Sequence, residues 1–124
     1  RTLPFDISVC QLKPEAIISP PSEFYCLAKT REELSLVCKS VDVPSEILKR
    51  EDGWRGFYID ASLDFSLVGI MARISGLLAQ SSISLFAIST FHTDYFLVTK
   101  EEFAKTLYVL EQAGYTVDRD IEAI

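Results

Sequence analysis

The strongest constraint on the fold is the order of the apolar segments in the C-terminal half of the chain. Residues 70–78 carry apolar side chains at three- and four-residue spacing, which predicts an α-helix with one buried face. Residues 103–110 repeat this spacing after Thr99 and Glu102, whose T-x-x-E pattern is typical of a helix start. Short apolar or aromatic runs of strand length lie at 54–59, 85–88, 95–98 and 115–117. The predicted order is strand, helix, strand, strand, helix, strand.

This order favours an α+β fold. With right-handed crossovers, the four strands form one antiparallel sheet with both helices on one face, which is the ferredoxin-like βαββαβ arrangement. Ser66 is the expected N-cap of the first helix, and Gly114 suits the C-cap of the second. The polar stretch 91–94 makes the second and third strands a hairpin. Because residues 85–88 are nearly all apolar, we expect that strand to be covered on one face and paired on both edges.

The N-terminal half repeats the pattern in reduced form. Apolar and polar residues alternate over 5–10, with Ile7 and Val9 on the apolar face, which predicts a half-exposed strand. Runs at 24–29 and 34–38 predict a second hairpin.

Helices are sparse in this half. Residues 44–50 predict one short helix, and a full helix before the hairpin is excluded by proline, which cannot occupy a helix interior. These prolines stand at positions 14, 20 and 21.

The two hairpins are related to each other as an internal repeat when Leu36-Val37 is aligned with Leu97-Val98. We therefore expect two βαββαβ units in tandem, a truncated unit at 1–50 and a complete unit at 51–124. The junction is expected at residues 49–53, and the two halves are expected to share one continuous sheet surface.

Composition and charge exclude several functions. A net charge of −6 argues against nucleic-acid binding, which requires a basic surface. The three cysteines are an odd number without a CxxC pair, and only one histidine is present, so no metal site and no disulfide framework is predicted. The longest apolar helical stretch, 68–79, contains Arg73 and is too short to cross a bilayer. We expect a cytoplasmic protein that uses no metal or cofactor and contacts neither nucleic acid nor membrane.

Residues suited to catalysis are few. A cysteine could pair with His92 as nucleophile and base without being close to it in sequence. However, Cys26 and Cys38 lie on apolar strands, where cysteines are typically inert, and Cys10 is less certain. We therefore predict no catalytic residues and no enzyme activity.

Two polar clusters are candidates for binding a small ligand. In the segment 89–94, Asp94 would hold a cation such as an α-amino group, and Thr90 would donate or accept a hydrogen bond. The alternative for this segment is a solvated turn, in which Asp and Thr are favoured for their turn propensity. In the segment 63–70, the free N–H groups of a helix start favour a carboxylate. Gly69 would leave room for that ligand there, and its alternative role is close backbone packing.

The chain resembles a known family at these same segments. Leu63-Asp64-Phe65-Ser66 through Gly69, Ser84 to Ser89, and Ser89-Thr90-Phe91-x-Thr93-Asp94-Tyr95-x-Leu97-Val98 resemble the small tandem ACT-domain proteins. Residues 3–6 and 33–38 fit the same group, so the resemblance covers nearly the whole chain. That group is related to the ACT units of the animal cytosolic arginine sensor and, more distantly, to the regulatory regions of aspartate kinase.

The resemblance implies a regulatory fold that binds amino acids at interfaces between ACT units. In the arginine sensor, the Thr, Phe and Asp of the motif line the ligand pocket opposite the strand-to-helix loop. The corresponding ligand-binding candidates in this chain are Thr90, Phe91 and Asp94, with Val68 and Gly69 from the loop and Ser89 beside them. The acidic loop residue of the sensor has no clear match here, which argues against arginine as the ligand.

Two functions stay open from the sequence. The first is a non-catalytic regulatory module that binds an amino acid or a similar small molecule at an ACT–ACT interface and forms a homodimer. The second is a ligand-free module that dimerises or binds another protein, for which an unpaired sheet edge is a ready means.

Overall fold

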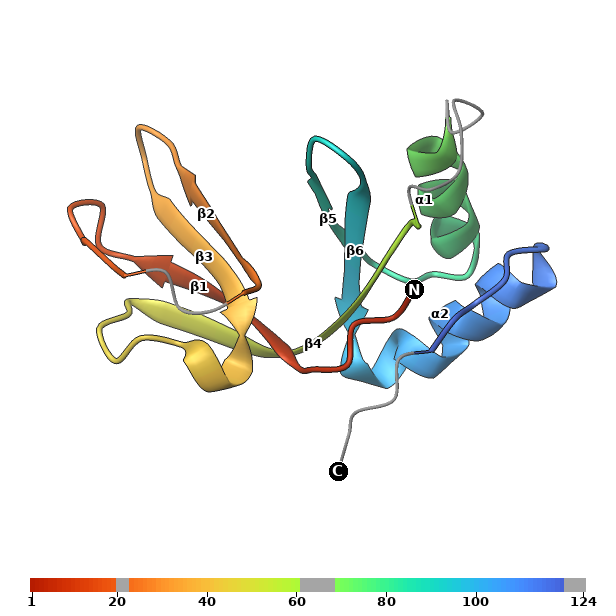
Figure 1. Ribbon diagram of the computed structural model, residues 1–124, viewed down its shortest axis with the longest axis horizontal. Coiled ribbons are helices and arrows are strands. Elements are labelled where there is room, and N and C mark those ends of the chain that lie inside the picture. Colours follow the sequence, from red (N-terminus) through yellow and green to blue (C-terminus); the bar gives the residue numbers. More distant parts are fainter. Residues whose placement is uncertain (20–22, 61–68, 120–124) are drawn as a thin grey trace. The chain divides into compact units, whose positions relative to one another are not determined.

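The computed structural model describes residues 1–19, 23–60 and 69–119, which form two compact units (Figure 1). Unit 1 contains Arg1–Pro4 and Arg55–Ile124, and unit 2 contains Phe5–Trp54. The elements in chain order are β1 (Ile7–Leu12), β2 (Tyr25–Lys29), β3 (Leu34–Lys39), the 3-10 helix η1 (Ser40–Asp42), β4 (Lys49–Tyr58), α1 (Ile70–Gln80), β5 (Phe86–Ser89), β6 (Asp94–Thr99) and α2 (Lys100–Gln112). The strands are hydrogen-bonded in the order β2-β3-β1-β4-β6-β5.

Strand β4 runs through both units. Its residues 49–54 pair antiparallel with β1 in unit 2, and its last four residues belong to unit 1. Gly53 has φ +85°, a conformation that glycine adopts at little cost, near the point where the strand passes from one unit to the other. In unit 1, the ring of Phe57 stacks on that of Phe96 in β6 at 5.2 Å between centroids. The N–H of Ile59 donates to the backbone oxygen of Asp94 at 3.3 Å. The end of β4 therefore lies beside the start of β6.

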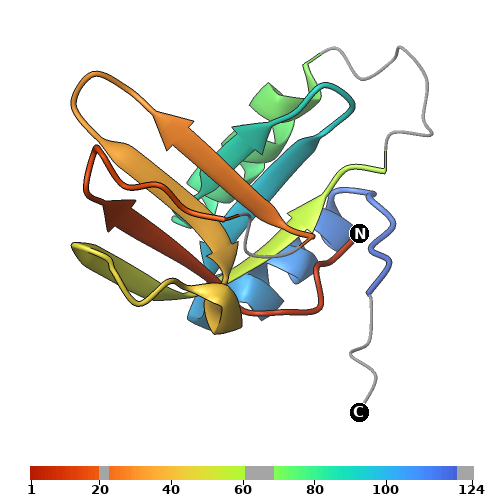
Figure 2. The ribbon, with the colours of Figure 1, turned by 60° about the vertical axis from the view of Figure 1, so that its left-hand side comes forward.

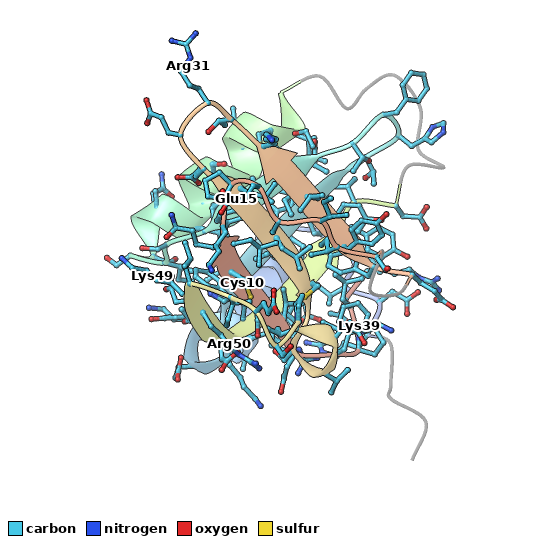
Figure 3. The ribbon with its side chains drawn as sticks, turned by 90° about the vertical axis from the view of Figure 1, so that its left-hand side faces the viewer. Cys10, Glu15, Arg31, Lys39, Lys49 and Arg50 are labelled. Atoms are coloured by element: carbon cyan, nitrogen blue, oxygen red, sulfur yellow. The ribbon has the colours of Figure 1, made fainter. Side chains whose placement is uncertain are left out.

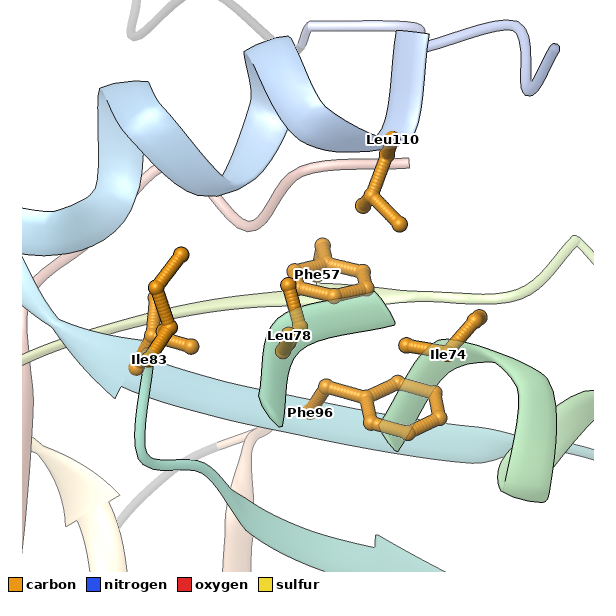
Figure 4. Packing of buried hydrophobic residues seen from close by; sticks show 7 residues of the cluster. Phe57, Ile74, Leu78, Ile83, Phe96 and Leu110 are labelled. Atoms are coloured by element: carbon orange, nitrogen blue, oxygen red, sulfur yellow. The ribbon is translucent and has the colours of Figure 1, made fainter. Parts of the chain in front are cut away.

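Both helices cover the same face of the strands in unit 1. Ile74 from α1 and Leu110 from α2 pack with Phe57 and Phe96 in one buried cluster (Figure 4). Burying side chains of this size contributes about 1.5–3 kcal/mol each, before the entropic cost of ordering the chain. The predicted α+β arrangement with helices on one face is confirmed for this unit.

The predicted strand at 115–117 does not form. The backbone of residues 1–3 lies beside β4 instead, because the N–H of Leu3 donates to the oxygen of Gly56 at 2.8 Å and Thr2 forms an antiparallel bridge with Phe57. The backbone of the segment after α2 meets this added strand through a bond of 3.0 Å from the N–H of Thr2 to the oxygen of Asp118.

Strand β5 lies at the outer edge of the sheet, so the expectation that it pairs on both edges is wrong. Among the described strands it pairs only with β6, and three of its four residues, including Phe86, are exposed. The apolar run indicated a strand correctly, but apolar residues report burial or contact and do not specify the number of neighbouring strands.

Helix ends differ from the expectation in detail. Helix α1 begins after Gly69 as N-cap, and the predicted cap Ser66 lies outside the described residues. Thr99 is the N-cap of α2 as expected, but its side chain makes no capping hydrogen bond, so the capping box is not formed. The C-cap of α2 is Ala113, one residue before the predicted Gly114.

Unit 2 contains the predicted second hairpin, β2 with β3, but the inward face of β1 differs from the expectation. Cys10 and Leu12 enter the core together with Ile7, and Ser8 is fully buried. The pairing of β1 with β4 shifts register between Ile7 and Val9. The extra residue lies on β4, between Glu51 and Trp54, and β1 keeps an unbroken register with β3. The core face of β1 is therefore the one that carries Ser8, Cys10 and Leu12, and the face predicted from Ile7 and Val9 is wrong.

No α-helix occurs in the described part of unit 2, and the short helix predicted at 44–50 is wrong. The helical turn η1 precedes it, and residues 49 and 50 already belong to β4. The core is covered by irregular chain, from which four residues pack against it: Ala16, Ile18, Val43 and Ile47.

The two hairpin turns are built alike. The N–H of Thr30 donates to the oxygen of Glu33 at 2.9 Å, and the N–H of Thr90 donates to the oxygen of Thr93 at 2.8 Å. Each threonine hydroxyl also accepts a bond of 3.2 Å, from the N–H of Glu33 and from the N–H of Thr93 respectively. This geometry makes Thr30 the counterpart of Thr90.

The matched turns correct the sequence alignment of the two hairpins by one residue. Counting from the threonines, Leu36 corresponds to Phe96 and not to Leu97. The buried triplet at 36–38 then falls on the buried triplet at 96–98. The side chains differ in size within each pair, which is why residue identity alone placed the alignment one step away.

Two of the three thiols lie in the core of unit 2. Burial raises the pKa of Cys10, although Arg50, its register partner on β4, acts in the opposite direction (Figure 3). Burial also raises the pKa of Cys38 from 9.0 to about 11, helped by the nearby Cys10. Cys26 is half-buried on the edge strand β2.

These environments predict selective alkylation. Iodoacetamide at pH 8 is expected to modify Cys26 in the native protein and to modify Cys10 and Cys38 only in denaturant, because the thiolate is the reactive form. Peptide mass spectrometry after a time course measures the modification of each cysteine, and native-state modification of Cys38 as fast as that of Cys26 would contradict the prediction.

The raised pKa of Cys38 also means that the contribution of its neutral thiol to stability is present below pH 9.0 and is lost as the pH rises toward about 11.

Helix α1 allows a matched test of backbone conformation. Gly69 has φ +85°, whereas Gly76 lies inside the helix on an exposed turn. Gly69→Ala is expected to lower the free energy of unfolding by about 1 kcal/mol, because a Cβ is strained at this φ. Gly76→Ala is expected to raise it by about 0.5–1 kcal/mol, because alanine is the better helix former. Urea denaturation of both variants checks the opposite signs, and a neutral Gly69→Ala would refute the assigned conformation.

Candidate functional site

Four predicted site residues lie together at the end of the β5–β6 hairpin. Ser89 and Asp94 face each other as the last register pair of the two strands. Thr90 and Phe91 follow in the turn, where the Phe91 side chain is 96% exposed. Its ring contacts His92 edge-on at 4.9 Å between centroids. The hairpin thus presents hydroxyls, a carboxylate and a bare aromatic ring within one short segment.

Thr90 uses its hydroxyl to hold the turn. The hydroxyl donates to the oxygen of Thr93 at 2.9 Å and accepts from the N–H of Thr93 at 3.2 Å. These bonds are the turn-stabilising alternative that the sequence left open, since Ser and Thr hydroxyls often close turns in this way. Thr90 therefore orders the segment that carries its neighbours.

The position of Asp94 is fixed by main-chain and hydroxyl contacts to Ile59, the residue that follows β4. Besides the bond from the N–H of Ile59, the Thr93 hydroxyl donates to the oxygen of Ile59 at 2.5 Å. The Tyr58 and Tyr95 rings lie 5.3 Å apart beside this contact. Asp94 is therefore held at the place where β4 ends and the chain leaves the sheet.

The carboxylate of Asp94 is half-buried and accepts no hydrogen bond or ion pair from any described residue. Two other aspartates are paired with arginines, Asp118 with Arg1 at 2.9 Å and Asp52 with Arg50 at 2.8 Å, whereas Oδ2 of Asp42 is buried without a hydrogen-bond partner among the described residues. The hydroxyl of buried Ser8 and then the guanidinium of Arg50 donate to Asp52 and hold its pKa below the usual range. A half-buried carboxylate without such a partner is suited to bind a cationic group, because partial burial weakens its hydration.

Of the two remaining predicted residues, Gly69 is the N-cap of α1. A Cβ on Gly69 would meet no atom of the described chain within 4 Å, so close packing does not explain this glycine and its positive φ does. Val68 lies outside the described residues. Figures 1 and 2 place the start of α1 and the β5–β6 turn at the same end of unit 1.

The described residues hold no group of three His, Cys, Asp or Glu side chains that could bind a metal ion. The raised pKa values of Cys10 and Cys38 disfavour the thiolate that a nucleophile requires. Neither α1 nor α2 is long and apolar enough to cross a membrane.

Sequence reasoning missed a cavity of about 450 Å³ in unit 1. Its wall is formed by β4, α1, α2 and the two extended segments near the chain ends, which are far apart in sequence. In the sequence, most of its lining residues look like ordinary core residues, so no local sequence pattern indicated a cavity.

Comparison with known proteins places the chain in a family. The ACT-domain family model matches residues 49–112, which is more than half of the chain. A search of curated proteins gave no match. ACT domains are regulatory, non-catalytic domains that commonly bind small ligands and dimerise.

Solved structures share the fold at low sequence identity. A crystal structure of an Agrobacterium tumefaciens protein is 24% identical with a TM-score of 0.86, covering 99% of this chain and 95% of that one. Aspartate kinase from Clostridium acetobutylicum is 10% identical with a TM-score of 0.62, covering 92% of this chain and 34% of the kinase. A domain assigned to the C-terminal regulatory region of aspartate kinase from Porphyromonas gingivalis W83 is 15% identical with a TM-score of 0.57, covering 94% and 97%. With the family match, the mixed α+β fold and the regulatory neighbours in agreement, the chain belongs to the ACT-domain family.

Proposed function

We propose that this protein is a cytoplasmic, non-catalytic regulatory module that binds an amino acid at an interface between ACT units. The observation that carries the proposal is the half-buried Asp94 carboxylate without a partner among the described residues. An α-ammonium group would supply the charge-assisted hydrogen bonds that this carboxylate lacks.

The neighbouring groups suit the rest of an amino acid. Ser89, the register partner of Asp94, offers a hydroxyl on the same hairpin end. The start of α1 after Gly69 offers main-chain N–H groups that favour the α-carboxylate. Val68, which lies outside the described residues, is kept as a ligand-binding candidate on the resemblance alone. The exposed ring of Phe91 would cover the ligand or the facing ACT unit, since a bare aromatic ring gains most from burial. Binding would alter assembly or partner contacts only if the two states differ in ligand affinity.

We also propose a tandem organisation, with a truncated ACT-like unit at 1–50 and a complete one at 51–124. The matched hairpin turns at Thr30 and Thr90 support it. So does the use of β4 beside β1 in unit 2 and beside β6 in unit 1.

A second candidate function is a ligand-free module that forms homodimers. The exposed edge strand β5 favours it, because the strand carries no charge or proline and Phe86 is 38% exposed. Edges of this kind readily pair with another chain.

Asp94→Asn tests the ligand site. The melting temperature is measured with each of the twenty amino acids at millimolar concentration. One or two of them are expected to raise it by several degrees, and the others are expected to leave it unchanged. A ligand at one hundred times its Kd stabilises the native state by about 2.7 kcal/mol. The variant is expected to lose this shift while keeping its own melting temperature, because no described residue donates to the carboxylate. The control Glu101→Gln removes an exposed carboxylate elsewhere in unit 1 and is expected to keep the shift; a full shift in Asp94→Asn refutes the assigned role.

Sedimentation equilibrium tests the second candidate. At micromolar concentration without ligand, edge pairing predicts a dimer, and Ala87→Lys on β5 is expected to dissociate it by placing charge on the edge. Ala79→Lys, on the exposed side of α1, is the matched control and leaves the dimer intact. A wild-type monomer at this concentration contradicts the dimerisation module.

A further inference from the structure

Strand β2 forms an open edge of unit 2 (Figure 1). It stands at one end of the strand order and pairs, among the described strands, only with β3. Four of its five residues are exposed, and the side chains of Tyr25 and Leu27 are 40% and 45% exposed. An edge strand with uncovered apolar side chains readily pairs with another strand.

The β2–β3 turn determines which backbone groups of β2 face outward. The N–H of Thr30 donates to the oxygen of Glu33, so these two residues form a hydrogen-bonded pair. Hydrogen-bonded and non-hydrogen-bonded pairs alternate along the continuous β2–β3 register, so Lys29, Leu27 and Tyr25 all lie in non-hydrogen-bonded pairs. Their backbone N–H and carbonyl groups therefore point away from β3, and these groups make no hydrogen bond to the rest of the described chain.

The sequence of this edge is complementary to itself when two copies run antiparallel. Pairing Cys26 with Cys26 of a second copy places Tyr25 opposite Leu27 in two symmetric pairs, each of which exchanges two backbone hydrogen bonds. At the next outward-facing position, Lys29 stands opposite Glu23 of the second copy. Cross-strand pairs of apolar side chains and of opposite charges stabilise antiparallel sheets.

The two charged side chains are available for this contact. Both are exposed, and neither has an ion-pair partner among the described residues. The ammonium group of Lys29 makes one long bond, of 3.4 Å, to the oxygen of Pro14, which leaves it protons to donate to a carboxylate. Charge complementarity thus favours a second copy of the same strand as the partner of β2.

We propose that β2 pairs with β2 of a second copy of this chain in the register centred on Cys26, so that two protomers form a symmetric dimer. In this register both exposed apolar residues face each other across the seam, and Lys29 meets a carboxylate at each end. One short strand from each protomer is a small interface, for which a Kd of about 10–100 µM is expected. The contact involves neither the amino-acid site proposed at Asp94 nor the β5 edge.

Cys26 provides a crosslinking test of the register. In a non-hydrogen-bonded antiparallel pair the Cα atoms are about 4.5 Å apart, which a disulfide can bridge. The two thiols project from the same face of the sheet, outside the seam of backbone hydrogen bonds. Diamide is expected to convert the protein at about 100 µM into a dimer linked from Cys26 to Cys26, as the two thiols pass two electrons and two protons to the reagent. Peptide mass spectrometry identifies the link, and absence of this disulfide overturns the proposal.

The matched control for crosslinking is the double variant Cys26→Ala with Ala28→Cys. Its thiol lies on the same strand and the same sheet face at an exposed position, but in the proposed register it stands opposite Phe24 of the second copy. The control is expected to crosslink about tenfold more slowly than the wild type, because the distance between its two thiols is too long for a disulfide. Equal rates would indicate random collision or another register and overturn the proposal.

Exchange of charges tests the two ends of the seam. Lys29→Glu and Glu23→Lys are each expected to raise the dimer Kd about tenfold, because like charges then face each other in both symmetric pairs. Combining the two substitutions is expected to return Kd to within about twofold of the wild type. Lys49→Glu makes the same charge change on β4, away from this edge, and is expected to change Kd by less than about twofold. Sedimentation equilibrium measures these constants, and failure of the combined variant to recover overturns the proposal.

Two further variants separate this interface from the β5 edge and from the amino-acid site. Ala87→Lys and Asp94→Asn are both expected to form the Cys26 disulfide at the wild-type rate, whether or not the proposed functions hold. Loss of the disulfide in Ala87→Lys would place the contact between copies at β5, and its loss in Asp94→Asn would place it at the β5–β6 hairpin end. Either result overturns the inference.

Discussion

The pairing of the end of β4 with the start of β6 is the interaction on which the rest of unit 1 depends. It stacks Phe57 on Phe96, and those rings form the floor on which α1 and α2 pack. The same pairing brings Ile59 to Asp94, and the Thr93 hydroxyl closes the contact at the oxygen of Ile59. One short stretch of strand pairing thus sets both the core and the location of the candidate ligand carboxylate.

Much of this fold was predictable because its signals are local. Helical spacing over 70–78 and the apolar runs of both hairpins report structure that forms between near neighbours in sequence. What the pattern missed depends on distant contacts. Residues 1–3 lie beside β4, whereas the strand predicted at 115–117 does not form, and the buried face of β1 carries Ser8 together with Cys10 and Leu12. Neither a partner segment from a distant part of the chain nor a polar residue on a core face has a period that a sequence window can detect.

The hairpin-end site and the cavity of unit 1 also differ in whether their residues are close together in the sequence. Thr90 and Asp94 were found because a polar turn between two apolar strands is a local feature, and the structure adds that the threonine closes the turn while the aspartate is left without a partner among the described residues. The cavity was missed because its lining comes from separate segments, and residues such as Leu107 look like core in any local view. The positive φ of Gly69 was not predicted, since a backbone dihedral cannot be derived from residue type alone.

The central claim is that the β5–β6 hairpin end, with Asp94 at its base, is the amino-acid site of this ACT-domain protein. Backbone amide NMR of the 13.9 kDa chain, titrated with an amino acid that raises its melting temperature, tests this most directly. The account predicts that the largest chemical-shift changes fall on residues 89–94 and on the start of α1. Changes confined to other parts of the chain, with the signals of 89–94 unmoved, would contradict it.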